Sequence, residues 1–320
     1  MVGGRDGGQR DEFQYAVGLA GKGFWMIFVM VVLCGVVGCG LGYFFGYRSK
    51  GLLRIRHLLD VKTAFAADGD GPKRLIVGGS DVLYSFDTDR IGEETGIRTV
   101  NFGLNVGLGM GFLLDVAREN VKPGDEVVLC LAYSLYFKPS YDVFAYEYYR
   151  MFRKRELRRF SWRRQMYYLL GNFKLNMAYR QKQFELAESG AYVRVRGSEL
   201  EACKNKPLVF PTQFTRTAAV RDLEQFCQWC ADQDVVVRVT YTSTLRFDVY
   251  DESSYLRELQ AYLTANYEVI GEPWDYLVPH EQIFNSVYHV NEAGQRARTE
   301  LFLREVRGGE VGCPSVMRMS

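Results

Sequence analysis

A serine and a histidine far apart in the sequence carry the clearest chemistry in this chain. Ser80 directly follows two glycines, Gly78 and Gly79, that end a short apolar run. A strand that stops at glycines and turns into a helix holds a side chain above the sheet edge and points backbone N–H groups at the atom it attacks. His289 stands just before the last helical pattern. A histidine there can act as the general base that a serine nucleophile needs.

Each of these residues also has a purely structural interpretation. A glycine-rich turn serves any tight connection between a strand and a helix. A histidine at a helix start can make only local hydrogen bonds. The two interpretations differ in geometry, because catalysis requires Ser80 and His289 to meet at one rim of a single sheet, within hydrogen-bond reach.

The segments around the two residues predict an α/β fold, a three-layer parallel sheet with helices on both faces. Apolar strand patterns alternate with helical patterns, which is typical of parallel sheets covered on both sides. Ligands of such sheets bind beyond the carboxyl ends of the strands, where Ser80 and Gly103 both lie. The expected strands are 75–77, 98–102, 126–132, 235–241 and 267–271.

Composition excludes several other classes. The chain has 320 residues and a formal net charge of +2, which gives no electrostatic case for nucleic-acid binding. Cys227 and Cys230 have the C-x-x-C spacing but no second pair, which favours buried thiols over a zinc or redox site. The glycine-rich turns lack the G-x-G-x-x-G spacing that would indicate a dinucleotide-binding site. We therefore expect no cofactor and no metal.

Residues 23–47 carry no charge. As a helix they would span about 37 Å, enough to cross a bilayer core of about 30 Å. The run exceeds the roughly 7–15 apolar residues of a signal peptide, so we expect an uncleaved transmembrane helix. Around it the sequence predicts a disordered tail at 1–22 and a connector at 48–72. The globular domain would occupy 73–306, followed by a tail at 307–320.

Residues 136–196 interrupt the α/β pattern with aromatic and basic side chains. We expect a helical insert with one apolar and one basic face. It either docks on anionic headgroups or a membrane partner, or is a solvated helix whose apolar side packs on the domain. Its basic residues are Arg150, Arg153, Lys154, Arg155, Arg158, Arg159, Arg163 and Arg164.

Taken together, these segments resemble the SGNH/GDSL-type hydrolase superfamily, and most of all its membrane-anchored members linked with O-acylation of cell-surface polysaccharides. Residues 78–81 match the first block, which carries the serine nucleophile. Residues 101–105 are similar to the second block, whose glycine N–H, here that of Gly103, helps form an oxyanion hole. Residues 289–294 look like the last block, which carries the general base. The resemblance implies a flavodoxin-like sheet.

The chain departs from the family pattern at two places. Many active relatives carry an aspartate three or four residues before the histidine, where this chain has Ser286 and Asn285. Losing such a carboxylate can cost a serine hydrolase orders of magnitude in rate. Asp275 or Glu281, in the same loop, is a candidate substitute, and a dyad of Ser80 and His289 is the other option.

The second departure concerns the oxyanion hole. The family's third block usually supplies an asparagine side chain after the third strand, where this chain has Tyr133 and Ser134. Asn105 is the candidate donor in its place. One lost oxyanion donor typically costs about 100- to 1000-fold in turnover.

Two functions from different classes follow from the resemblance. In the first, Ser80 attacks an acyl ester of a cell-surface glycan, and the acyl group passes to water (esterase) or to a sugar hydroxyl (O-acyltransferase). In the second, a catalytically impaired member binds a glycan or docks to a membrane O-acyltransferase. Retention of Ser80 and His289 favours the enzyme, whereas Asn285 and Ser286 favour the binding protein.

The orientation of the chain is a further expectation. Basic residues after the apolar run outnumber those before it, which by the positive-inside rule indicates a cytoplasmic domain. The resemblance implies the opposite side, and we expect a single-pass inner or plasma membrane protein with an extracytoplasmic domain. The flanking basic residues are Arg5, Arg10 and Lys22 before the run, and Arg48, Lys50, Arg54, Arg56 and Lys62 after it.

Overall fold

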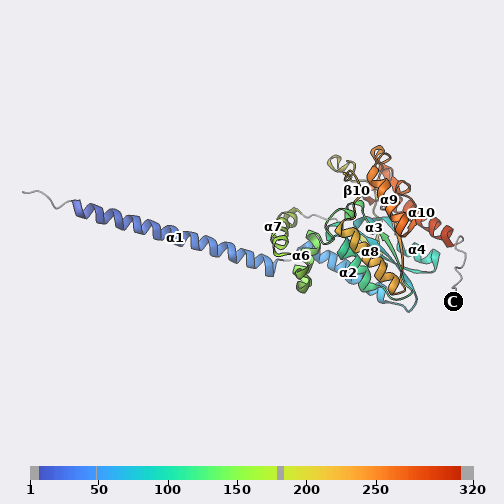
Figure 1. Ribbon diagram of the computed structural model, residues 1–320, viewed down its shortest axis with the longest axis horizontal. Coiled ribbons are helices and arrows are strands. Elements are labelled where there is room, and N and C mark those ends of the chain that lie inside the picture. The colour runs from blue at the N-terminus through green and yellow to red at the C-terminus, as the bar shows by residue number, and fades with distance from the viewer. Residues whose placement is uncertain (1–6, 48, 179–183, 311–320) are drawn as a thin grey trace, which may run out of the picture. The chain divides into compact units, whose positions relative to one another are not determined.

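The computed structural model describes residues 7–47, 49–178 and 184–310, and it divides the chain into two compact units between Ser49 and Lys50. The first unit is one long helix, α1 (Gly7–Gly46) (Figure 1). Its segment Gly23–Tyr43 is long and apolar enough to cross a membrane. The helix begins well inside the stretch expected to be disordered, since no proline interrupts residues 7–46.

The second unit contains a five-stranded sheet in the order β2-β1-β3-β6-β8, with every neighbouring pair parallel. All five strands overlap the segments expected from the sequence. In parallel α/β folds the crossover helices cover both faces, so the strands are apolar on both sides. The strands are β1 (Lys73–Gly78), β2 (Arg98–Gly103), β3 (Glu126–Cys130), β6 (Val236–Thr240) and β8 (Glu268–Ile270).

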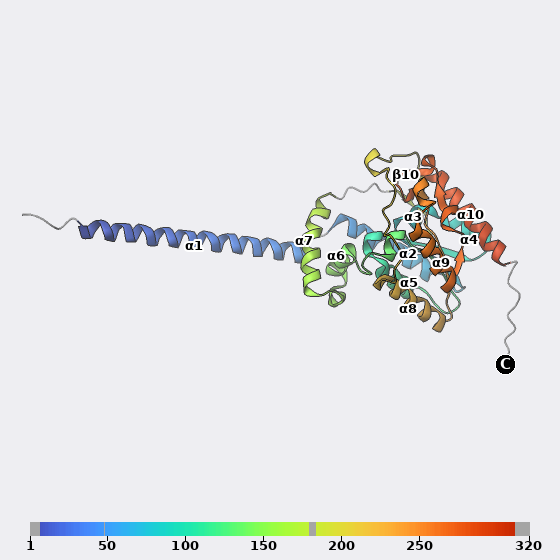
Figure 2. The same ribbon diagram turned by 45° about the horizontal axis from the view of Figure 1, so that its top comes forward.

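Two hydrophobic clusters lie on opposite faces of the sheet and confirm the three-layer arrangement. Alternate residues of β1 divide between them: Leu75 and Val77 join the larger cluster, and Ile76 joins the smaller. The larger contains residues of α2 (Lys50–Ala67), α5 (Met110–Asn120), α8 (Ala218–Asp232) and α9 (Ser254–Asn266). The smaller contains residues of α4 (Thr88–Thr95) and α10 (Glu292–Glu310). Helix α3 (Ser80–Ser85) contributes to both, with Val82 in the smaller cluster and Leu83 and Tyr84 in the larger. Figure 2 shows α5 and α8 apart from α4 and α10.

Helix α2 corrects the expected connector. Leu52, Ile55 and Leu59 recur at helical spacing and are buried, so the domain begins at Lys50 rather than at Lys73. Interspersed basic residues disguise this apolar face in the sequence. One of them, Lys62, is completely buried and donates hydrogen bonds to the carbonyl oxygens of Asn101 (2.5 Å) and Gly103 (2.9 Å).

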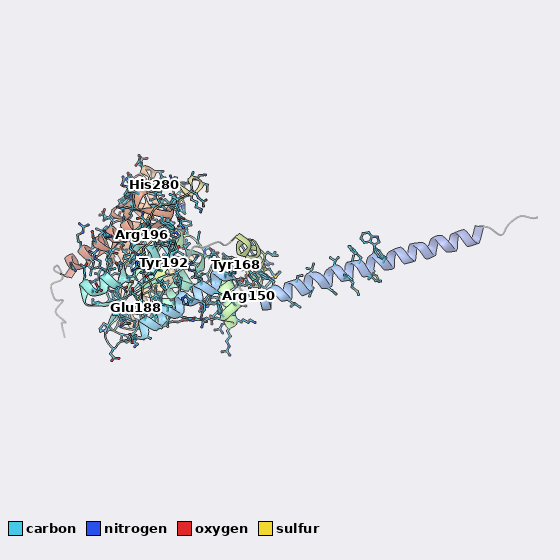
Figure 3. The ribbon with its side chains drawn as sticks, turned by 180° about the vertical axis from the view of Figure 1, so that it is seen from behind. Arg150, Tyr168, Glu188, Tyr192, Arg196 and His280 are labelled. Carbon is cyan, nitrogen blue, oxygen red and sulfur yellow. The ribbon has the colours of Figure 1, made fainter. Side chains whose placement is uncertain are left out.

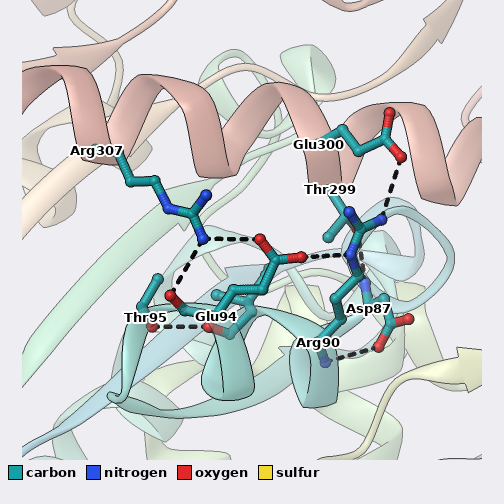
Figure 4. A network of polar contacts seen from close by, with 8 residues as sticks. Asp87, Arg90, Glu94, Thr95, Thr299, Glu300 and Arg307 are labelled. Carbon is teal, nitrogen blue, oxygen red and sulfur yellow. Dashed lines mark hydrogen bonds and ion pairs between the residues drawn. The ribbon is translucent and has the colours of Figure 1, made fainter.

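Helix α10 is joined to α4 by a polar network on the surface (Figure 4). Arg90 pairs with Glu94 at 2.7 Å and with Glu300 at 3.3 Å, and Arg307 pairs with Glu94 at 2.7 Å. These ion pairs connect α4 with α10, which begins three residues after His289. The helix continues to Glu310, into the stretch expected to be a tail, and residues 311–320 lie outside the described part of the chain.

The insert is helical in its first part only. It contains α6 (Val143–Phe152), a short 3-10 segment (Lys154–Arg159) and α7 (Trp162–Ala178). Residues beyond 183 form a small antiparallel pair, so the expectation of a wholly helical insert was wrong at its end. The remaining short strands are β4 (Glu185–Leu186), β5 (Tyr192–Val193), β7 (Thr244–Leu245), β9 (Leu277–Val278), β10 (Ile283–Ser286) and β11 (His289–Val290).

Candidate active site

Ser80 is the first residue of α3, immediately after β1. The turn that presents it needs glycine at two positions. A Cβ on Gly78 would collide with the carbonyl oxygen of Cys130 in β3 and with the side chain of Val82. A Cβ on Gly79 would lie 2.6 Å from Asp81 Oδ1. The two glycines thus let α3 begin directly at the end of β1, at the carboxyl rim of the sheet.

The structure brings the predicted serine and histidine together. Ser80 Oγ lies 2.8 Å from His289 Nε2, although 208 residues separate them in the sequence. His289 is the first residue of β11, which forms an antiparallel hairpin with β10 and leads into α10. The hairpin therefore carries the imidazole to the rim where β1 ends.

Asn285 holds the other ring nitrogen of this imidazole. Its Oδ1 lies 2.8 Å from His289 Nδ1 and, as an amide oxygen, can only accept a hydrogen bond. Nδ1 therefore carries the proton, and Nε2 of the neutral ring is left to accept from Ser80. This is the tautomer that a general base beside a serine requires.

The imidazole is enclosed by aromatic side chains and only partly exposed. Tyr84 stacks on His289 with ring centroids 4.3 Å apart and an interplanar angle of 13°. Tyr84 in turn packs on Tyr192 and Phe284. Loss of solvent around the ring lowers the pKa of His289 to about 4, because water no longer stabilises the charged form. The base is neutral at pH 7.

Neither expected acid substitute contacts His289. Asp275 is exposed, and its Oδ2 accepts from the backbone N–H of Glu272 at 2.8 Å, where it caps a short helical turn. Glu281 is also exposed. The side-chain partner of the imidazole is Asn285 instead, and the Asp275 carboxylate is engaged at the turn that follows β8. Of the two departed positions, Asn285 contacts the imidazole, while Ser286 pairs with His289 across the hairpin.

The expected oxyanion role of Gly103 also needs correction. Its N–H donates to Asn101 Oδ1 at 2.9 Å, so this donor is already satisfied within the protein. A Cβ on Gly103 would collide with the backbone of Leu83, so glycine at this position serves the close packing of β2 against α3.

Asn105 lies on a segment that approaches the serine turn. A Cβ on Gly79 would lie 3.4 Å from Val106 Cβ, which places the neighbouring Asn105 close to Ser80 in the fold. Asn105 Oδ1 accepts from the N–H of Gly107 at 2.8 Å, which leaves its amide N–H₂ as the group able to donate.

Asp81 is a residue that the sequence analysis did not assign to the site. It follows Ser80 directly, is 2% exposed, and accepts a hydrogen bond from Thr242 Oγ1 at 2.7 Å. Burial raises its pKa to about 6. In the sequence, only its position next to Ser80 indicates a role for Asp81. Its burial could not be predicted, because it depends on contact with Thr242, which lies beyond β6.

The two cysteines of the C-x-x-C spacing and the possibility of a metal site can also be assessed. Burial raises the pKa of the Cys227 and Cys230 thiols to about 12, so they are unreactive side chains of α8. Within the described ranges, no group of three or more His, Cys, Asp or Glu side chains is placed to hold a metal ion.

Comparisons with known proteins assign the chain to no family. No protein-family model matches the chain, and no curated protein matches it. One solved structure that it resembles comes from Streptococcus pneumonia and is provisionally described as a platelet activating factor. That protein is 13% identical, and the match covers 78% of this chain and 92% of that one with a TM-score of 0.39. So distant a likeness carries no information about activity.

Proposed function

We propose that this chain is a membrane-anchored serine esterase or O-acyltransferase whose reaction is carried by Ser80 and His289. The observation that supports it is the 2.8 Å contact between Ser80 Oγ and His289 Nε2. Two further features agree with the proposal: the neutral imidazole and the Nδ1–H tautomer held by Asn285. A serine hydroxyl with a neutral base at hydrogen-bond distance is the arrangement that acyl transfer requires.

The proposed first half-reaction forms an acyl-enzyme. Ser80 Oγ attacks the ester carbonyl carbon while its proton passes to His289 Nε2. The tetrahedral intermediate then expels the alcohol, which takes the proton back from Nε2. The acyl group is left on Ser80 Oγ.

The second half-reaction repeats these steps with a new acceptor. Water or a sugar hydroxyl gives its proton to His289 Nε2 and attacks the acyl carbon. Collapse of the second intermediate returns the proton to Ser80. The product is a carboxylic acid if water attacks, and a new ester if a hydroxyl attacks.

The negative charge on the intermediate needs donors at the rim. Since the N–H of Gly103 is engaged by Asn101, we assign this role to the N–H of Ser80, at the first turn of α3, and to the side-chain amide of Asn105.

The substrate, the anchor and the orientation belong to the same proposal. The resemblance of residues 78–81, 101–105 and 289–294 to the family blocks supports an acyl ester of a cell-surface glycan as substrate, and a membrane O-acyltransferase as partner. Helix α1 would anchor the chain through Gly23–Tyr43, with the domain on the extracytoplasmic side.

A second function is favoured by one specific observation. Asn285 gives the imidazole a neutral partner, so the positive charge that His289 acquires during the reaction is not balanced by a carboxylate. A chain impaired in this way would bind an acylated glycan, or dock to a membrane O-acyltransferase, without turnover.

A fluorophosphonate probe on the full chain in detergent distinguishes the two. We expect labelling that disappears in Ser80→Ala and persists in Ser85→Ala, which removes a hydroxyl with no hydrogen-bond partner from the same helix. Absence of labelling at every pH from 4 to 9, with acylated glycan still bound, would refute the enzyme and support the binding protein.

A further inference from the structure

Helix α7 carries an unusual concentration of exposed apolar side chains. Trp162 is 71% exposed, Met166 50%, Tyr167 73% and Leu170 73%. The other large hydrophobic side chains that are exposed in the described part of the second unit stand singly on separate segments: Leu53, Val209, Val236 and Val249. Scattered exposed residues are ordinary, whereas a contiguous group marks a contact surface.

The four side chains share one face of the helix. At about 100° per residue, Trp162, Met166, Leu170 and Tyr167 lie on an arc of about 140°. The opposite face already has its partner, since Tyr168 and Asn172 are buried against α6. Helix α7 is therefore apolar on two sides, and only one of them is covered by the domain.

Two arginines of α7 lie on or next to this exposed face. At about 100° per residue, Arg163 falls within the arc, and Arg164 falls about 60° beyond it, toward Tyr168. In the first part of the insert, Arg153 pairs with Glu119 at 2.6 Å and Arg159 pairs with Glu156 at 2.7 Å. No carboxylate lies within ion-pair distance of Arg163 or Arg164 among the described residues. Their guanidinium groups lie instead over aromatic rings, 5.6 Å from Trp162 and 5.9 Å from Tyr168.

We propose that this face of α7 rests in the interfacial layer of an anionic phospholipid bilayer. Trp162 and Tyr167 would lie at headgroup level, Met166 and Leu170 would reach the upper acyl chains, and Arg163 and Arg164 would bind lipid phosphates. Aromatic and apolar residues on one helix face, with basic residues on and beside that face, are the combination that binds this layer.

The chain's connectivity supports the membrane as the occupant. Helix α2 starts at Lys50, and only residues 47–49 separate it from the end of the apolar helix α1. Within the second unit, Figures 1 and 2 place α7 at the end of the domain where α2 begins. Figure 3 shows Tyr168 of α7 beside Arg150 and far from His280.

A second basic group at the start of α2 agrees with this. A cavity of about 420 Å³ is lined there by Lys50, Arg54 and His57, together with apolar side chains. The same end of the domain thus offers cations from two elements to anionic headgroups.

A second copy of this chain fits the face poorly. Residues 162–172 contain four apolar or aromatic side chains on the exposed arc and two arginines, but no aspartate or glutamate. Two α7 helices packed face to face would oppose like charges with nothing to neutralise them. Lipid phosphates supply that neutralisation, and arginine side chains can extend from an apolar face to reach them.

The test uses the full chain reconstituted in vesicles and follows the fluorescence of Trp162. Both chains compared carry Trp25→Phe, and one of them also carries Trp162→Phe. Subtracting the spectrum of the second from that of the first gives the emission of Trp162. The vesicles are phosphatidylcholine with roughly one third phosphatidylglycerol, with or without bromine on the acyl chains. We expect emission that is blue-shifted and quenched by the brominated lipid.

Charge-reversal variants test whether Arg163 and Arg164 contribute to lipid binding. Arg163→Glu with Arg164→Glu should weaken the quenching several-fold, because each basic residue near an anionic surface contributes to binding. Arg296→Glu with Arg304→Glu is the matched control. It changes two exposed arginines of α10, which Figures 1 and 2 show at the opposite end of the domain, and should leave the quenching unchanged.

Two results would overturn the proposal. Emission typical of a water-exposed tryptophan, unquenched by bromine, would show that α7 does not touch lipid. Blue-shifted emission that brominated lipid leaves unquenched would show that protein, such as a second copy, covers the face. Neither result would bear on Ser80 and His289.

Discussion

Asn285 Oδ1 and His289 Nδ1 lie 2.8 Å apart on the β10–β11 hairpin, so a neutral amide occupies the place that a carboxylate holds in many serine hydrolases. In the observed orientation the amide oxygen accepts from the ring and selects the same tautomer as a carboxylate would, although an asparagine also carries an N–H₂ group that a carboxylate lacks. It cannot match a carboxylate in stabilising the imidazolium. The site thus combines correct orientation with a weak base.

Asn285→Asp should raise the pKa of His289. An adjacent opposite charge typically moves a pKa by about 1–3 units toward the charged form. Since the pKa of His289 is about 4, activity should fall in acid with a midpoint near pH 4 in the wild type and about 1–3 units higher in the variant. The measurement is the rate of inactivation by the fluorophosphonate probe as a function of pH. The plateau of this rate at higher pH should be greater in Asn285→Asp than in the wild type.

Two controls accompany this variant. Asn285→Leu, which removes the acceptor, should lower the plateau, because the required tautomer is no longer held. Asp275→Asn should change nothing, because that carboxylate bonds to Glu272 rather than to the imidazole. Identical acid midpoints in Asn285→Asp and the wild type would mean that residue 285 does not act on the base.

The strands and the Ser80 turn were predictable because their signals are local. A run of apolar residues ending at Gly78 and Gly79 specifies a strand and a sharp turn without reference to the rest of the chain. The acid partner was not predictable in the same way. Asp275, Glu281 and Asn285 all lie within 15 residues of His289, and only the hairpin register selects Asn285.

Helix α2 was not predicted as part of the domain because its burial also depends on contacts between distant parts of the sequence. From the sequence, Lys62 is expected to be a solvated residue next to the membrane. In the structure its amino group donates hydrogen bonds to two backbone carbonyl oxygens at the end of β2. Burial of a lysine depends on acceptors from a distant strand, and those become visible only after the sheet has formed.

Lys62→Met should destabilise the domain, since two buried carbonyls lose their donor. An unsatisfied buried acceptor costs about 1–3 kcal/mol. Burial lowers the pKa of Lys62 well below 10.5, so the unfolded chain binds this proton more readily than the folded one. Wild-type stability should therefore rise with pH between the lowered pKa and 10.5, a rise that Lys62→Met lacks. Urea unfolding of both chains across this range, in one detergent, gives the difference, and parallel curves would contradict the assignment.

Asp81→Asn tests whether the buried carboxylate beside the serine is kept for function. Because its pKa is raised to about 6, the folded domain binds this proton more tightly than the unfolded chain, and stability falls as the pH rises from 3.8 to about 6. The variant should lose less stability than the wild type over that range. If Asp81 serves the site, labelling at Ser80 should slow although the fold is no weaker. Unchanged labelling would leave Asp81 a structural residue.

Gly78→Ala tests the turn itself. The added methyl group would meet the carbonyl oxygen of Cys130, which belongs to the backbone of β3 and cannot rotate away. Overpacking of this kind costs about 1–3 kcal/mol or more, so we expect a clear fall in the unfolding midpoint and weaker labelling of Ser80. Gly92→Ala is the matched control, because its methyl group would make an ordinary contact 3.5 Å from the carbonyl oxygen of Ile97. Helix α4 should gain up to about 1 kcal/mol from that change, so a loss equal to that of Gly78→Ala would mean that close packing at the serine turn is not what requires glycine.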